Sequence, residues 1–145
     1  MYLEEYDFIS VIDQDDLDAI TQENHEKRDK ALKMAMDEVR TYTRTKYRID
    51  AEFAKTDEAR NEYLMMIVMD LTLYHLYSML PSRMGMETRE KRYDTAIKWL
   101  AGVRDGKNDP GIPTIDNPDN ISPTDNPEMY DNLRFGGNEK VSSQW

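Results

Sequence analysis

The chain has 145 residues, the size of one ordinary domain, and its 29 acidic and 19 basic side chains give a net charge of −10. It contains no cysteine, which excludes disulfides and thiolate metal sites. No apolar run approaches the roughly 18 residues of a membrane span, and the first residues show no targeting pattern, so we expect no membrane partner.

The acidity belongs to the two ends of the chain. Residues 1–24 hold eight acidic side chains and no Lys or Arg, residues 25–100 hold 15 basic and 13 acidic groups, and residues 101–145 hold four basic and eight acidic groups. A middle of mixed sign is typical of a solvated helical bundle. Nothing forms the basic stripe that DNA binding needs, so we expect DNA only as non-specific passing cargo.

Two short helical turns are predicted first, in "YLEEYDFISVI" and in "QDDLDAITQ", with Asp13 capping the second. Apolar side chains then recur at i, i+3, i+4 and i+7 between His25 and Tyr47. This spacing predicts a long amphipathic helix with Asn24 as its N-cap. A polar connector, "RIDAEFAKTDEA", separates this helix from the next one.

The stretch Tyr63–Leu80 is apolar almost all round, and it predicts a helix that Thr56 caps and that Pro81 and Gly85 end. We expect this helix to be the buried centre of a bundle. Its large side chains leave two alternatives open, because all of them can belong to the core or some can face another chain. The side chains concerned are Met65, Met66, Met69, Tyr74 and Tyr77.

A last helix is predicted over Glu87–Val103, with Gly106 closing it. The predicted fold class is therefore all-α, a small bundle of four to five helices over residues 1–105. Five of the six prolines lie at or beyond Pro110, so residues 106–145 are predicted to form a long extended tail.

This tail cannot fold alone, because ordering its 40 residues costs more backbone entropy than its few apolar side chains return on burial. Either it has no fixed structure, or contacts on another surface order it. Its Asn-Pro and Ser-Pro pairs favour extended backbone, and its aromatic residues are of the kind that anchor interfaces, so we expect it to dock on a partner. The expected anchors are Ile112, Ile115, Ile121, Met129, Tyr130, Leu133, Phe135 and Trp145.

Groups that could carry chemistry are few, so we expect no enzymatic activity, no cofactor and no metal site. The two histidines lack metal-binding spacing, and we expect a hydrogen-bonded core residue at His75 and an exposed one at His25. Glu87, Glu90 and Asp94 form a carboxylate face, which is the one hint of an enzyme. Acidic residues also favour the first turn of a helix on dipole grounds, and no matching cluster lies on the central helix.

Asp70 stands alone in the apolar central helix. An ionised carboxylate is costly to bury unless it is paired. We therefore expect a buried ion pair with Arg40 or Arg44 of the preceding long helix, which would fix the register of the two helices.

The order of these parts resembles the small helical head–tail connector, or adaptor, proteins of tailed bacteriophages, especially the variety of Mu-like prophages. The resemblance covers about residues 1–111. It rests on "MYLEEYDFISVI", "DDLDAITQ", "ALKMAMDEVRTYTRTKY", the apolar "YLMMIVMDLTLYHLYSM" and "EKRYDTAIKWLAGVRDGK". The chain departs from the pattern in its longer tail and in its connector, which lacks a proline-rich loop.

The resemblance implies a structural protein of the virion that forms a ring, usually of twelve copies, beneath the portal. Such a ring joins the capsid to the tail or neck and extends the DNA channel. The implied partners are the portal protein, neighbouring copies of itself and a tail or neck protein. The implied location is the neck of the virion, with the host cytoplasm during assembly.

The alternative function is a free acidic helical interaction module, or a DNA mimic, that regulates another protein by occupying its basic site. Both functions use the acidity of the chain. Only the connector also uses the tail anchors and the surplus apolar surface of the central helix.

Overall fold

The structure is a computed structural model, and it describes residues 1–80 and 85–116. Within these residues the chain is helical, which confirms the predicted all-α class. The elements are α1 (Glu5–Phe8), α2 (Gln14–Thr21), α3 (His25–Thr43), α4 (Ile49–Phe53), the short 3-10 helix η1 (Asp57–Ala59), α5 (Glu62–Ser78) and α6 (Met86–Arg104).

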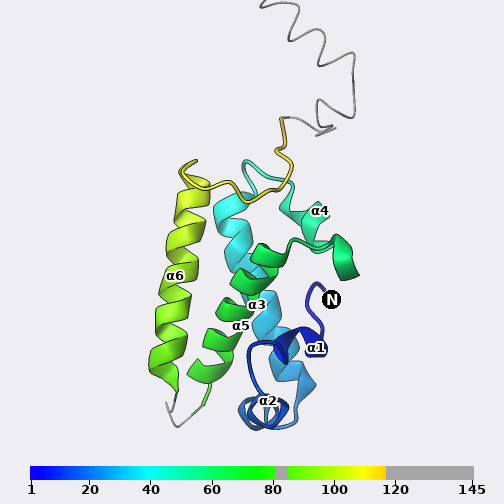
Figure 1. The fold of residues 1–145 in the computed structure, drawn as a ribbon, viewed down its shortest axis with the longest axis vertical. Coiled ribbons are helices and arrows are strands. Elements are labelled where there is room, and N and C mark those ends of the chain that lie inside the picture. The colour runs from blue at the N-terminus through cyan, green and yellow to red at the C-terminus, as the bar shows by residue number, and fades with distance from the viewer. Residues whose placement is uncertain (81–84, 117–145) are drawn as a thin grey trace, which may run out of the picture. The chain divides into compact units, whose positions relative to one another are not determined.

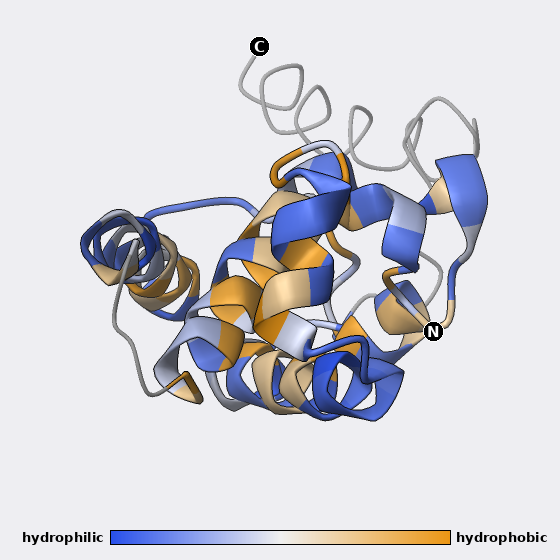
Figure 2. Ribbon diagram, turned by 90° about the horizontal axis from the view of Figure 1, so that it is seen from below, coloured by the Kyte–Doolittle hydropathy of each residue, from blue (hydrophilic) through white to orange (hydrophobic). Residues whose placement is uncertain are grey.

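Three long helices form the body of the molecule, and α5 packs against both α3 and α6 (Figure 1). Hydrophobic residues concentrate along α5 and on the faces that turn toward it (Figure 2). Nine residues of α5 are buried, so the central position predicted for this helix is confirmed. The short α1 and α2 cover the side of the bundle away from α6.

The large side chains of α5 mostly belong to the core. Met69 is buried, Met65, Met66 and Tyr77 pack partly buried against the core, and Tyr74 stacks on Tyr93 of α6 at 4.0 Å between ring centroids. The apolar side chains that α5 and its C-cap expose most are instead those of Tyr63 and Met79.

The start of α5 differs from the prediction. Thr56 precedes η1 rather than α5, and its side chain makes no capping hydrogen bond. The cap of α5 is Asn61, whose side-chain oxygen accepts a hydrogen bond from the amide of Leu64 at 3.0 Å. The reason is that Arg60 adopts an extended conformation, which ends η1 and restarts the helix one residue later.

Three other predicted end residues stand at helix ends, whereas Pro81 lies outside the described residues and Gly85 is the N-cap of α6. Asn24 caps α3 by accepting a hydrogen bond from the amide of Glu26. Gly106 follows α6 in the left-handed conformation, with φ of +79°, as a helix-closing glycine does. Asp13 occupies the N-cap position of α2, although its side chain makes no capping hydrogen bond.

Candidate interaction surfaces

The described part of the predicted tail lies on the helical body. The amide of Arg48 donates to the carbonyl of Pro113 at 2.8 Å, and the amide of Ile115 donates to the carbonyl of Lys46 at 2.9 Å. Asn61 donates from its side chain to the carbonyl of Pro110 at 2.9 Å. Because these bonds tie residues 110–115 to the ends of α3 and α5, the compact unit runs from Met1 to Ile115.

This arrangement corrects one predicted anchor. Ile112 is only 5 % exposed and belongs to the core of the body, so it is not free to dock on a partner. Ile115 is 45 % exposed and stays a candidate. The remaining anchors lie outside the described residues. They are Ile121, Met129, Tyr130, Leu133, Phe135 and Trp145. The division of the chain at residue 105 stays a prediction.

Asp70 is buried and paired, but its partner differs from the prediction. Arg92 of α6 donates from Nε to its Oδ1 at 2.8 Å. Arg40 instead bonds Asp37 and Asp50 on the surface, and Arg44 lies exposed just beyond α3. The reason is geometric, because Asp70 projects from α5 toward α6 rather than toward α3.

A polar cluster joins the three long helices around Glu38 of α3. One oxygen of this carboxylate lies 3.0 Å from Nε2 of His75 on α5, and the other accepts from the hydroxyl of Tyr93 on α6 at 2.5 Å. The predicted hydrogen bond of His75 is therefore confirmed, and its ring is partly buried. Burial acts to raise the pKa of Glu38, but the hydrogen bonds from His75 and Tyr93 outweigh it and lower that pKa.

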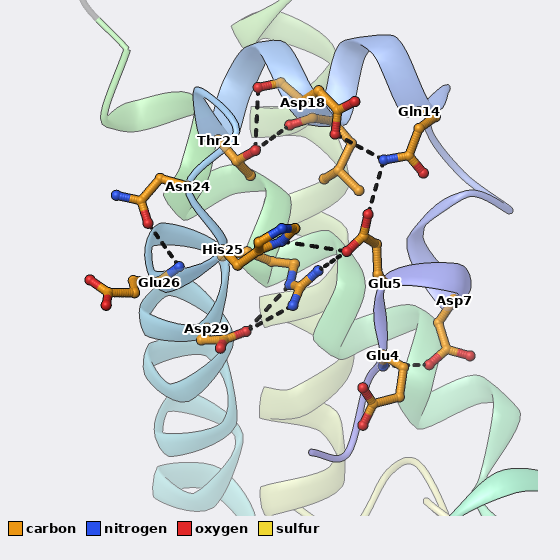
Figure 3. A network of polar contacts seen from close by, with 12 residues as sticks. Glu4, Glu5, Asp7, Gln14, Asp18, Thr21, Asn24, His25, Glu26 and Asp29 are labelled. Atoms are coloured by element: carbon orange, nitrogen blue, oxygen red, sulfur yellow. Dashed lines mark hydrogen bonds and ion pairs between the residues drawn. The ribbon is translucent and has the colours of Figure 1, made fainter.

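The acidic N-terminal segment is fastened to α3 through Glu5 (Figure 3). Its carboxylate accepts from Arg28 at 2.7 Å and from the side chain of Gln14 on α2 at 3.1 Å, and His25 lies 3.5 Å away. The hydrogen bond from Arg28 lowers the pKa of Glu5. The side chain of His25 is 69 % exposed, as predicted.

The predicted carboxylate face on α6 lies in solvent. Glu87 pairs with Lys91 at 3.0 Å, and Glu90 and Asp94 are exposed. Within residues 1–80 and 85–116 no three His, Cys, Asp or Glu side chains lie close enough together to hold a metal ion.

A first hollow, of about 550 Å³, lies between α1, η1 and α5, and we call it the acidic hollow. Met65 and Met69 of α5 and Tyr6 of α1 give it an apolar lining. Its acidic rim residues are exposed and form no ion pair with any described residue. They are Asp57, Glu58 and Glu62.

Arg60 lies beneath the acidic hollow but does not neutralise its rim. The guanidinium is only 6 % exposed and forms a two-pronged ion pair with Asp7, at 2.7 and 3.1 Å. It also donates to the carbonyls of Tyr2 and Asp57 and to the hydroxyl of Tyr6. These contacts fix the walls of the hollow and hold the ring of Tyr6, which is 57 % exposed, at its edge.

A second hollow, of about 510 Å³, lies between the start of α5 and the end of α6, and we call it the aromatic hollow. The rings of Tyr63 and Trp99 form one side of it, with centroids 5.0 Å apart. Lys98 and Lys107 are exposed beside these rings and form no ion pair within the described part of the chain. Asn108 also lines this hollow, and its side chain donates to the carbonyl of Trp99 at 3.1 Å.

The sequence alone does not reveal either hollow, because each is assembled from segments far apart in the chain. The one sequence signal is the pair of aromatic residues at positions 63 and 99, at the polar edges of two predicted helices. Tyr63 is therefore an exposed aromatic residue on a helix that is otherwise largely buried.

Comparison with known proteins decides the origin of the chain. Residues 2–126 match the model of the family described as bacteriophage Mu, Gp36. The chain belongs to the bacteriophage Mu Gp36 family. The match spans the body and the beginning of the predicted tail, so the coarse expectation of a Mu-like phage protein is confirmed.

Neither the curated proteins nor the solved structures contain a match. Among the described residues, no helix combines the length and apolar character that crossing a bilayer requires.

Proposed function

We propose that this Gp36-family protein is a structural component of the virion that forms a ring, of twelve copies, beneath the portal. The ring joins the capsid to the tail or neck and extends the channel through which DNA passes. It acts by holding proteins together, without enzymatic activity and without a cofactor.

The observation that carries this proposal is the way the chain leaves the body. Main-chain hydrogen bonds with Lys46, which accepts, and Arg48, which donates, fix residues 113–115 beyond the end of α3, after Ile112 has entered the core. Among residues 1–80 and 85–116, Ile112 is the last residue of the core. The apolar side chains from Ile121 onward lie outside the described residues, and we propose that they dock on a partner.

Charge supports the proposed channel. The chain carries a net charge of −10, so a ring of such subunits repels the phosphate backbone rather than binding it. DNA then slides through without adhering.

The test is electron microscopy of the protein mixed with the portal protein of the same phage. We expect portal particles with one added ring on the face that turns away from the capsid interior, and native mass spectrometry gives its copy number. Portal particles that gain no density at saturating protein would contradict the proposal.

The acidic interaction module remains the second candidate, because the eight acidic residues of the N-terminal segment lie on α1, α2 and their flanks. A module of that kind binds a nucleic-acid-binding protein and is displaced by DNA. Capture of such a protein, with release by added duplex DNA and no binding to the portal, would favour this function instead.

A further inference from the structure

The acidic hollow and the aromatic hollow differ in charge, and they lie on different sides of one body. Glu62 and Tyr63 are successive residues in the first turn of α5, about 100° apart around the helix, and they line one hollow each. The acidic hollow continues toward α1 and the aromatic hollow toward α6, and these two helices lie on opposite sides of α3 and α5 (Figures 1 and 2).

Each hollow carries charges that the described residues leave unpaired. The acidic rim has Asp57, Glu58 and Glu62, because Arg60 beneath it is already bonded to Asp7. The aromatic hollow has Lys98 and Lys107, while its one acidic neighbour, Asp105, bonds Arg104 at 3.1 Å.

Each hollow also presents an exposed ring. Tyr6 lines the acidic hollow with its ring 57 % exposed, and Arg60 holds its hydroxyl at 3.2 Å, so the position of the ring is fixed. Tyr63, which is 48 % exposed, forms an open aromatic surface with Trp99 on the other side. Aromatic anchors within a polar rim are typical of interface hot spots.

We propose that the two hollows are the two halves of one contact between neighbouring copies of this chain. Tyr6 of one copy packs against Tyr63 and Trp99 of the next, and Lys98 and Lys107 of that copy pair with the acidic rim beside Tyr6. The occupant of each hollow is a second copy, and charge complementarity selects it.

A contact between two different patches is head-to-tail, and repeating it gives a closed ring when the rotation between copies closes. This inference rests on the proposed ring and specifies its subunit interface. The same geometry places the first residues of the chain at every subunit boundary.

The first experiment joins carboxylates to lysines with a carbodiimide in the unaltered full-length protein, free and on the portal, using mixed ¹⁴N and ¹⁵N copies. We expect mixed-isotope peptides that link Lys98 or Lys107 to Asp57, Glu58 or Glu62. A ring on the portal whose copies are linked only through other residues would overturn the interface and leave the proposed function standing. If no ring forms on the portal, the proposed function fails. The interface is then tested by the free protein at high concentration, where absence of the expected links would contradict it.

The second experiment reverses charges. Lys98→Glu with Lys107→Glu, and separately Glu58→Lys with Glu62→Lys, should each weaken self-association at least about tenfold. Mixing the two variants should restore it, because each then meets a complementary partner. The control Lys30→Glu with Lys33→Glu changes the same charge on α3, outside both hollows, and should have no such effect. Failure of the mixture to associate, with both variants folded by thermal midpoint, would contradict the interface.

Discussion

Arg60 is the residue that joins the N-terminal segment to the rest of the body. Its guanidinium bonds the carboxylate of Asp7, the carbonyl of Tyr2 and the carbonyl of Asp57, and both charged side chains are 6 % exposed. A buried ion pair contributes little net stability compared with a well-packed apolar pair, but removing one partner leaves the other charge uncompensated.

We therefore expect Asp7→Ala to lower the free energy of unfolding by about 3 to 5 kcal/mol. Urea unfolding measures the change. The matched control is Asp37→Ala, because Asp37 is 72 % exposed in its ion pair with Arg40 and should cost less than about 1 kcal/mol. Equal costs for the two variants would show that the Asp7 pair is not shielded from solvent.

Glu38 gives the stability of the protein a defined dependence on pH. Its pKa in the folded protein lies below the ordinary value of 4.5, despite burial, because His75 and Tyr93 bond the carboxylate. A carboxylate with a lowered folded pKa stabilises the protein above its ordinary pKa, and this stabilisation is lost as the pH falls through the lowered value.

The variant Glu38→Gln should therefore be less stable than the parent at about pH 6, and the difference should shrink as the pH is lowered to about 3. Unfolding in urea at a series of pH values measures it. Glu90→Gln, at an exposed position of α6, is the control and should show no such trend. A parent-to-variant difference that stays constant over this range would show that Glu38 does not titrate with folding.

At the scale of single residues, the sequence predicts that a buried charged side chain has a partner, but it does not predict which residue that partner is. An isolated acid at position 70 of an apolar helix has to be paired, and it is paired. Periodicity places Asp70 on a helix face, but it does not show which neighbouring helix covers that face. The cluster around Glu38 escapes prediction for the same reason, since its members lie on three different helices.

At the scale of elements, the turn after α6 depends on Gly102. The amides of Lys107 and Asn108 both donate to the carbonyl of Gly102, and the side chain of Asn108 lies against its Cα while bonding Trp99. A methyl group at position 102 would collide with this side chain. Glycine leaves room here for the amide of Asn108, so a methyl group would displace this side chain from its bond with Trp99.

Gly102→Ala should lower the free energy of unfolding by roughly 1 kcal/mol, although the same exchange inside an exposed helix raises it by roughly 0.5 to 1 kcal/mol. In an Asn108→Ala background the collision is absent, so Gly102→Ala should become stabilising. Thermal unfolding of the two single variants and the double variant measures this reversal of sign. Stabilisation by Gly102→Ala alone would show that Asn108 yields without cost.

The elements themselves were largely predictable, and their boundaries less so. A long apolar stripe predicts α3, α5 and α6, because burying a continuous face dominates their stability. The five-residue α4 and the turn η1 carry too few residues for such a stripe. The sequence therefore predicts a polar connector there, without its two short helices. The true cap of α5 was missed because Thr56, like Asn61, is a residue that caps helices.

At the scale of the whole molecule, composition predicts a change in the chain near residue 105, and the structure shows that the next ten residues still contact the body. Ile112 is a core residue in a segment rich in Pro, Asp and Gly, and a single apolar side chain gives no periodicity that would show its burial. Main-chain hydrogen bonds, which sequence patterns do not predict at this spacing, hold the same segment.

The remaining anchors lead to a prediction about assembly. Phe135→Ala and Trp145→Ala should each weaken incorporation of the protein into portal complexes without lowering the thermal midpoint of the body, because we propose that both rings dock on a partner. Co-sedimentation with the portal and differential scanning calorimetry measure the two properties. Ile112→Ala is the contrasting variant, and it should lower the midpoint because it leaves a cavity. A matching fall in the midpoint for Phe135→Ala or Trp145→Ala would show that those rings pack on their own body.

The bonds that tie residues 113–115 to Lys46 and Arg48 also decide how the protein bears force. Tension on the chain beyond residue 116 reaches these main-chain bonds first, and the side chain of Ile112 takes the load only after they break. The attachment therefore yields in steps, and the helices are loaded last. The first bonds to break under such a pull are therefore main-chain bonds outside the helices.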